Sequence, residues 1–476
     1  MSRVKTIFRN LSWLFISQII AAVCGFIWTL LIARYLGVSD YGILGFATSF
    51  TGILTILNDM GIATHIIRHI STDYDSTSKY LGNGLVLKSI FSIANFGLSL
   101  VILIIMRCDS ITIAVTMLFT IETIIKAFYG LFTGTFQAYE EGKYQGISNT
   151  IMNLLLLIFI LLVIFTDKGL FGITFAYIIA NLIALICLYY YLKKHITKPK
   201  IEFDKQFCRT IVIAAIPFAL SSLLYTIYYS IDVVMLTELV GNYATGIYNA
   251  TYKLISVLTL FYSVYIAVIF PVMSKLFKND KKILIISFEK SAKYLTLITI
   301  PLAIATMFYS SDIITLFFGQ EYAAASSPLS ILIWTICLLF INGAAATLLN
   351  ASYEEVAVTK VNAIAAVFNI LLNFYMIPHY TYNGAAITTV LSDLLILCIY
   401  LYLMNKKGLN PNKKLLFDIG KIIVASGVLG IALYFLNLNM WIAIPVGIAI
   451  YLLSIVLLKF FDDNDKYIIK EILGKN

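Results

Sequence analysis

The sequence predicts an all-α polytopic membrane protein with about fourteen transmembrane helices. Its 476 residues are 60% hydrophobic and only 12% charged, about half the charged fraction of a soluble globular protein. Apolar runs long enough to cross a bilayer recur from end to end. Because lipid offers no hydrogen bonds to the backbone, such runs must be helices.

Fourteen candidate spans follow in order along the chain. The first follows a short basic start and is too long for a signal peptide, so we expect a retained transmembrane helix. The spans lie near residues 11–33, 42–64, 81–106, 111–137, 146–166, 170–192, 210–236, 245–273, 288–309, 327–350, 361–378, 383–404, 417–437 and 440–460.

The distribution of charge predicts that both termini are cytoplasmic. With the N-terminus inside, the inner side holds 28 of the 34 basic residues, the outer loops hold three, and three fall within spans. This asymmetry is the positive-inside pattern. The net charge of +9 therefore reflects orientation. Basic residues that alternate with spans do not form one footprint, which argues against a nucleic-acid partner.

The longest basic linker, residues 193–209, divides the chain into two six-helix halves. We expect an N-terminal bundle over 1–200, a second bundle over 201–410, and two further helices with a tail over 411–476.

Three sequence echoes relate the two halves. "LGVSDYGILGFA" (36–47) is echoed by "VGNYATGIYNAT" (240–251) at an offset of 204. Two further echoes, beginning at Ala138 and Phe171, have offsets of 214 and 212. Since each half holds an even number of helices, the copies run in the same direction, as in transporters built from parallel repeats. The first echo predicts four turn glycines at the outer mouth: Gly37, Gly42, Gly241 and Gly246.

Ionisable residues within spans are costly and are therefore candidate functional residues. Lys88 and Lys126 lie at similar depth in the inner half of the membrane, and Glu122 is one helical turn from Lys126. One interpretation is a structural pair between Glu122 and Lys126, with Lys88 extending to the cytoplasmic surface. The alternative is a cationic site that faces the substrate.

The second half contains its own in-span charges. Asp232 and Lys253 share a depth in the outer half of the membrane and are expected to pair, either as a structural contact or as a gate. Asp393 occupies the position that matches Asn181 in the first repeat. It is either a buried, protonated or hydrogen-bonded carboxyl, or a coupling-ion site.

Three charged residues lie near the ends of spans. Arg34 and Glu238 correspond at an offset of 204 and flank the outer mouth just before the glycine turns. Asp59 lies at the inner end of the second span and is expected to be interfacial. We consider Asp59 and Glu238 candidates for gating or coupling.

Catalytic chemistry is hard to find in this sequence. The four histidines are far apart, none has metal-ligand spacing with another ligand, and there is no phosphate-binding glycine loop before Lys and Ser or Thr. The outer loops are too short for a typical membrane glycosyltransferase or polymerase. We therefore expect neither a metal nor a cofactor, and no enzyme activity.

Motifs along nearly the whole chain carry a family resemblance. The start contains an Arg-Tyr-Leu-Gly turn, a Tyr-Gly at the start of span two and "NDMGI" at its end. Further on come "DVVMLTELVGNYATGIYNATYKL" (232–254), "FFGQEYAAASSPLSIL" (317–332) and "NILLNFYMIPHYTYNGAAITTVLSDL" (369–394). Together they resemble the Wzx-like polysaccharide-biosynthesis flippases. These belong to the MOP superfamily, which also holds MATE drug exporters and lipid II flippases.

The resemblance implies two bundles around a cavity that opens alternately to each side of the cell membrane. It implies an isoprenoid-pyrophosphate-linked oligosaccharide as substrate, with polysaccharide-assembly proteins as possible partners besides the bilayer. The anionic headgroup calls for cations in the cavity, and Lys88, Lys126 and Lys253 are the candidates, with Arg34 at the outer mouth. The alternatives are a MATE-type cation-coupled exporter, a lipid II flippase, a membrane glycosyltransferase or polymerase, and a non-transporting scaffold.

Overall fold

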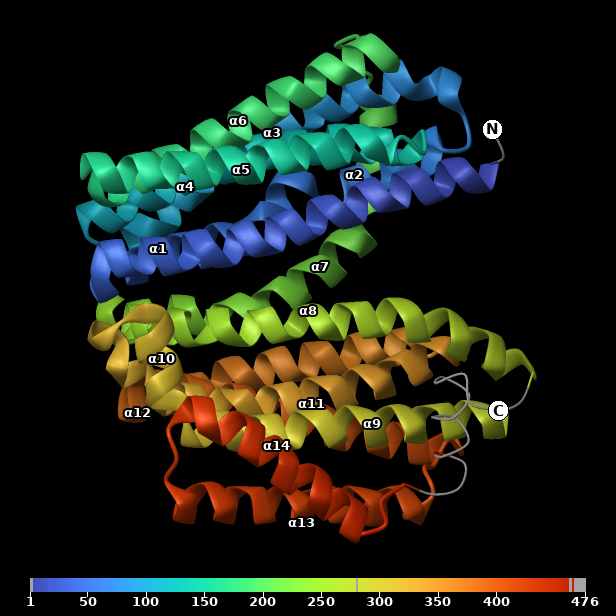
Figure 1. The fold of residues 1–476 in the computed structure, drawn as a ribbon. Coiled ribbons are helices and arrows are strands. Elements are labelled where there is room, and N and C mark those ends of the chain that lie inside the picture. Colours follow the sequence, from blue (N-terminus) through green and yellow to red (C-terminus); the bar gives the residue numbers. More distant parts are fainter. Residues whose placement is uncertain (1–2, 280, 462–464, 466–476) are drawn as a thin grey trace. The chain divides into compact units, whose positions relative to one another are not determined.

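The computed structural model describes residues 3–279, 281–461 and 465. Within them the chain is helical, with short connections and no strand (Figure 1). The helices are α1 (Arg3–Asp59), α2 (Ile62–Ile70), η1 (Tyr74–Ser76), α3 (Thr77–Ile105), α4 (Ser110–Ala138), α5 (Gly142–Thr166), α6 (Gly169–His195), α7 (Lys205–Leu239), α8 (Asn242–Asn279), α9 (Lys281–Phe308), α10 (Ser310–Phe318), η2 (Gln320–Ala325), α11 (Ser326–Ala351), α12 (Glu355–Lys406), α13 (Lys413–Leu436) and α14 (Met440–Leu457).

Among the described residues, eleven helices are long and apolar enough to cross a membrane. Two of them contain a sharp break: α1 at Gly37 (φ 74°) and α12 at Thr381 (φ 50°), three residues after Pro378. Each of these two therefore supplies two of the expected spans, and α7, with 35 residues, supplies one more. The predicted all-α architecture of about fourteen transmembrane helices is confirmed.

The short helices lie next to the ends of the long helices. α2 continues the second span beyond a break at Met60 and Gly61, both of which have positive φ. α10 and η2 precede α11, where the resemblance placed a short re-entry.

Contacts divide the chain into two compact units, Met1–Asn249 and Ala250–Asn476. In unit 1, α1 packs on α3, α4, α5 and α7, and α6 packs on α4 and α5 (Figure 1). In unit 2, α11 packs between α9 and α12, while α13 packs on α9 and α14 on α13. The division expected from the repeat, with borders at residues 200 and 410, is a different one and stays a prediction.

The linker between the predicted halves is fastened to α3. A Cβ on Gly82 would lie 1.8 Å from the carbonyl oxygen of Lys200, so only glycine permits this approach. The side chain of Asn83 accepts a hydrogen bond from the backbone N–H of Asp204 at 2.8 Å. Asp204 in turn caps α7 by accepting from the N–H groups of Gln206 and Phe207. The start of α7 is thereby held within unit 1.

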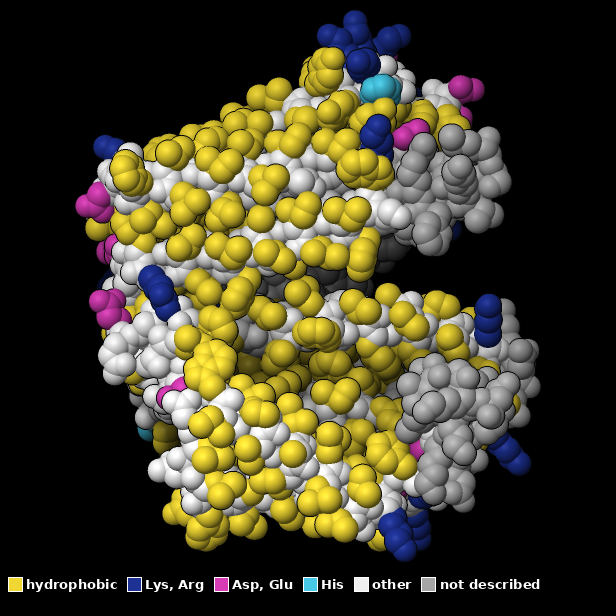
Figure 2. Space-filling view, in the orientation of Figure 1, with side chains coloured by type: hydrophobic (Ala, Val, Ile, Leu, Met, Phe, Trp, Pro, Cys, Tyr) yellow, Lys and Arg dark blue, Asp and Glu magenta, His cyan; other side chains and the backbone are white. Residues whose placement is uncertain are grey.

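The distribution of apolar and charged side chains on the surface is the opposite of that in a soluble protein. On the visible face of each unit, hydrophobic side chains cover the helices along most of their length, and charged side chains gather toward the helix ends (Figure 2). Large apolar residues are widely exposed: Phe165, for example, is 89% exposed and Phe435 78%. Such a surface requires lipid around it, and the chain is a multi-pass membrane protein.

Candidate functional site

Unit 1 contains a buried ion pair between α1 and α3. Lys88 in α3 is fully buried and pairs with Asp59, the last residue of α1, whose side chain is 29% exposed. Lys88 therefore does not extend to the cytoplasmic surface, and Asp59 is its counter-ion. A buried ammonium needs such a partner, because an unpaired charge in low dielectric is very costly.

A second charged group lies between α4 and α6. The carboxylate of Glu122, 2% exposed, accepts from the Lys126 ammonium at 2.7 Å and from the Asn181 amide at 3.0 Å. The expected pair within α4 is therefore present. The Lys126 side chain is 49% exposed. A cation held by a buried carboxylate but open on its other side can also contact an anion that enters from that side.

Amides and hydroxyls make buried contacts beside these two charged groups. The Asn95 side chain donates to the Asn58 side chain at 3.0 Å, and Ser99 donates to Asn95 at 3.4 Å. Asn58 also approaches the hydroxyl of Thr123, the neighbour of Glu122, at 3.5 Å. Polar groups thus join α1, α3 and α4 within the bundle, where such contacts satisfy groups that lipid could not.

The four predicted turn glycines divide into two kinds. Gly37 and Gly241 are the turn residues, with φ of 74° and 114°, a region that glycine adopts without strain. Gly42 and Gly246 lie inside helices, where α1 crosses the start of α8. A Cβ on Gly42 would lie 1.9 Å from the carbonyl oxygen of Asn242, and one on Gly246 would lie 2.0 Å from that of Val38. These two glycines serve close approach.

Further polar residues surround this crossing. A Cβ on Gly45 would meet the side chain of Asn249, 2.7 Å from its amide nitrogen. Asp232 in α7 is 3% exposed and accepts a hydrogen bond from the Tyr248 hydroxyl at 2.9 Å. The expected pairing of Asp232 with Lys253 would cross from unit 1 to unit 2 and stays a prediction.

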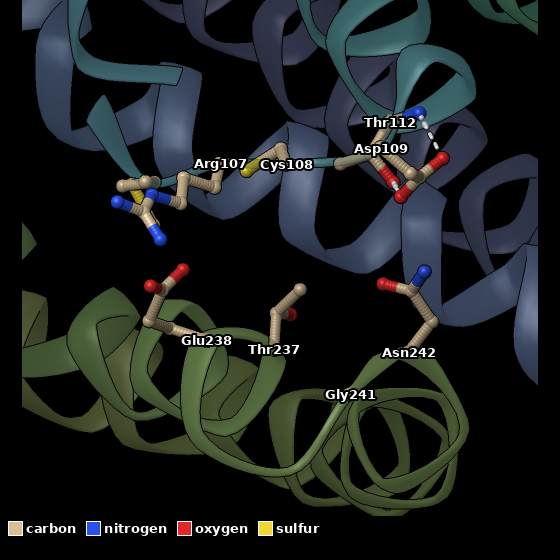
Figure 3. Close-up of a pocket in the computed structure, with 9 residues that line it drawn as sticks. Arg107, Cys108, Asp109, Thr112, Thr237, Glu238, Gly241 and Asn242 are labelled. Atoms are coloured by element: carbon tan, nitrogen blue, oxygen red, sulfur yellow. Dashed lines mark hydrogen bonds between the residues drawn. The ribbon is translucent and has the colours of Figure 1, made fainter. Parts of the chain in front are cut away.

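A pocket of about 250 Å³ lies in unit 1 between the α3–α4 connection and the α7–α8 turn (Figure 3). The Arg107 guanidinium points toward the Glu238 carboxylate across it. Burial, reinforced by the charges of Glu238 and Asp109, raises the pKa of the Cys108 thiol to about 11. Although burial opposes ionisation of Asp109, hydrogen bonds from Thr112 and from the start of α4 lower its pKa below the usual value. Arg34, the other residue expected at this mouth, is exposed.

In unit 2 the in-span candidates lie apart from one another along the chain. Lys253 is exposed on α8, and Asp393 on α12 is 7% exposed. The Asn342 amide of α11 donates to the backbone carbonyl of Asp393 at 2.9 Å, and Asn373 donates to Asn369 at 2.9 Å. Amides therefore provide much of the polar packing here.

The sequence reading missed a buried charge cluster in unit 2. Lys293 of α9, 3% exposed, pairs with Asp418 of α13 at 3.0 Å and with Asp465 at 2.7 Å. The Tyr294 hydroxyl also donates to Asp465 at 2.7 Å. The available signals were Lys293, which the charge count above assigned to the inner side although it lies within the ninth span, and Asp418 at the start of the thirteenth. The cluster fastens the last two helices to α9.

No group of three or more His, Cys, Asp or Glu residues in the described part of the chain is placed to hold a metal ion. The six cysteines are unpaired with one another, and Cys24, Cys208 and Cys337 are buried.

Comparison with known proteins identifies what this chain resembles. A family model described as "Polysaccharide biosynthesis protein" matches residues 7–277, and one described as "MatE" matches residues 217–376. The capsular polysaccharide biosynthesis protein CapF of Staphylococcus aureus is 26% identical over 402 residues, which cover 83% of this chain and 98% of CapF. An uncharacterized membrane protein of Methanocaldococcus jannaschii is 24% identical, over 85% of both chains.

Solved structures share the fold. The lipid II flippase MurJ, in an inward closed conformation, superposes with a TM-score of 0.79 at 16% identity, covering 94% of this chain and 98% of MurJ. An inward-facing multidrug-resistance MATE transporter of the MOP superfamily superposes with a TM-score of 0.69 at 15% identity, covering 82% of this chain and 95% of the transporter.

Proposed function

Because the chain belongs to the polysaccharide biosynthesis protein family, we propose that it is a flippase for an isoprenoid-pyrophosphate-linked oligosaccharide. It moves this lipid from the cytoplasmic to the outer leaflet of the cell membrane and makes or breaks no bond in it. The family match carries this proposal. The CapF relative, named for capsular polysaccharide biosynthesis, and the fold shared with a lipid II flippase support it.

The headgroup chemistry explains the charges of unit 1. A sugar pyrophosphate cannot enter hydrocarbon unaided, because its charge would lose hydration without a replacement partner. Lys126 is the best-placed cation, since it is half exposed and Glu122 neutralises it while no anion is bound. Lys88 is fully buried against Asp59. We therefore expect it to stabilise the fold and to add positive electrostatic potential, and not to touch the pyrophosphate itself. Lys253 and Arg34, both exposed, are the remaining candidate contacts.

We propose that transport follows alternating access of the two repeats, with both termini in the cytoplasm. The six-helix repeats, 1–200 and 201–410, are the moving parts, and α13 and α14 move with the second. In this orientation the Gly37 and Gly241 turns face outward. Asp232, Asp393, Asp59 and Glu238 are then candidates for coupling or gating.

A flipping assay tests this function. Purified protein in liposomes should move a fluorescent isoprenyl-pyrophosphate disaccharide between leaflets, measured as the fraction that an impermeant quencher reaches. The Lys88→Ala/Lys126→Ala pair should lower the initial rate by about tenfold or more, because two cations are lost. Lys126→Arg should retain most of the rate. Lys143→Ala, in the α4–α5 region outside the predicted spans, is the matched control.

The second candidate function, a MATE-type exporter, is favoured by the MatE match over residues 217–376 and by the buried in-span acids Glu122, Asp232 and Asp393. An exporter would carry an organic cation and leave the labelled lipid in place. Transport of a cation such as ethidium, without lipid flipping and unaffected by the lysine substitutions, would replace the flippase assignment.

A further inference from the structure

We propose that the linker between α6 and α7, residues 196–204, binds the anionic phospholipid headgroups of the membrane surface and inserts two apolar side chains beside them. This surface belongs to unit 1 and is separate from the residues proposed to contact the transported lipid. It would bind phospholipid whatever the transported substrate is.

One side of the linker is fastened to α3. The Ser78 hydroxyl donates to the backbone carbonyl of Lys198 at 3.5 Å. The contacts at Gly82 and Asn83, described above, hold the backbone of later residues in the linker. Because all these contacts use the backbone of the linker, its side chains remain available for other partners.

The side chains in and around the linker are strongly basic. Between residues 193 and 209 the chain has six basic and two acidic residues. One of the two acids, Asp204, caps α7 and lies 3.6 Å from the Lys79 ammonium. The six basic residues are all exposed: Lys193, Lys194, Lys198, Lys200, Lys205 and Arg209. Lys and Arg side chains gather at this end of α6 (Figure 2), and such a cluster next to a transmembrane helix is typical of anionic-lipid binding.

Two large apolar side chains are exposed among these basic residues. Ile201 is 80% exposed and Phe203 is 59% exposed. Both lie between the predicted spans 170–192 and 210–236, beyond the hydrocarbon that covers exposed apolar residues elsewhere on the surface. At the headgroup boundary, apolar side chains insert toward the acyl chains while lysine ammonium groups stay among the phosphates. An anionic membrane surface therefore suits both kinds of side chain at once.

The connection between α12 and α13 provides a contrast. It is also basic, with Lys406, Lys407 and Lys413 exposed, and it lies on the same predicted side of the membrane. Its large apolar residue, Leu409, is only 3% exposed. Charge that sets orientation needs no exposed apolar side chain beside it. The exposed pair in the α6–α7 linker therefore points to a surface that binds lipid.

Tryptic cleavage of the full chain in nanodiscs measures whether lipid covers the linker. Cleavage after Lys200 should be about tenfold slower in phosphatidylcholine containing about 30% phosphatidylglycerol than in phosphatidylcholine alone, because bound headgroups shield this bond. Cleavage after Lys407, in the α12–α13 connection, is the internal control and should change little. Nanodiscs leave both membrane faces open to trypsin, so the orientation of the chain does not affect the result.

Two variants that keep Lys200 separate the apolar side chains from the charge. Ile201→Ser/Phe203→Ser should abolish the protection by phosphatidylglycerol. Lys193→Gln/Lys194→Gln/Lys198→Gln should weaken it several-fold, because three positive charges near the headgroups are lost. Each variant is compared with itself in the two lipids, so altered intrinsic cleavage cancels.

Val356→Ser is the matched control. It removes an apolar side chain that is 68% exposed at a position outside the linker and the predicted spans, and it should keep the full protection. A variant that fails to fold would also be cut rapidly after Lys407, so loss of folding is distinguished from loss of lipid binding.

Two results would overturn the lipid-binding assignment. Equal cleavage after Lys200 in the two lipid mixtures would leave the linker to water or to a protein partner. Protection that survives Ile201→Ser/Phe203→Ser would mean that orientation charge alone explains the lipid preference. No transported lipid is present in these measurements, so neither result bears on the proposed function.

Discussion

Both repeats have an acidic residue and an asparagine in contact between their fourth and sixth helices, but the two residue types are on exchanged helices. In the first repeat the carboxylate is Glu122 on α4 and the amide is Asn181 on α6. In the second, Asn342 on α11 donates to the backbone of Asp393 on α12. Asn181 and Asp393 are equivalent at an offset of 212.

Comparing the two copies distinguishes contacts that the shared fold uses for helix packing from contacts that serve transport. A polar contact between these two helices is present in both copies, so it belongs to the common architecture. Both copies contain buried charge: the first has Lys88 on Asp59 and Lys126 on Glu122, and the second has Lys293 on Asp418. Buried charge within a membrane is expensive. The copies differ in that Lys293 is buried whereas Lys126 is half exposed, so we expect the cation of the first copy to contact an anion.

The largest effect should come from breaking the ion pair that the second repeat does not share. Asp59→Asn leaves Lys88 fully buried without a counter-ion, and removal of one partner from a buried pair costs about 3–5 kcal/mol. Lys88→Met should cost less, because the Asp59 carboxylate that remains is partly exposed. Thermal unfolding in detergent measures both variants.

The double variant Asp59→Asn/Lys88→Met is the control for this pair. A neutral pair can be as stable as a buried ion pair, so the double variant should unfold at a temperature near that of the unmodified protein. If Asp59→Asn alone is no less stable than the double variant, the pair is not the buried contact described above.

A smaller effect should distinguish the exchanged positions. Glu122→Gln and Asn342→Ala each remove one polar contact, worth about 1 kcal/mol, and should lower the unfolding temperature by similar amounts. Only Glu122→Gln should change flipping, because it removes the counter-ion of Lys126. Equal flipping rates in the two variants would mean that charge in the first repeat has no special role.

Much of the fold was predictable from the sequence. The spacing of apolar runs and the distribution of basic residues led to fourteen spans, because membrane thickness fixes helix length and the loops carry orientation charge. The first repeat echo also predicted two equivalent turns, and Gly37 and Gly241 do form turns.

What the sequence could not supply was the choice among possible partners. Depth along a helix placed Lys88 level with Lys126, but rotation about the helix axis sends Lys88 to Asp59. Gly42 and Gly246 looked like turn residues because a close approach between distant segments leaves no local signal. The Lys293 cluster joins α9 to residues more than a hundred positions later, and no local pattern predicts such a contact.

Binding of the headgroup to the first repeat is the most direct test of the account. Purified protein should bind a short-chain isoprenyl-pyrophosphate disaccharide, and Lys126→Gln should weaken this binding about tenfold, the loss expected for one charge-assisted contact of about 1.4 kcal/mol. Asn342→Ala should leave it unchanged. If the Lys126 variant binds as tightly as the unmodified protein, the first repeat does not hold the pyrophosphate, and the contrast between the repeats has another origin.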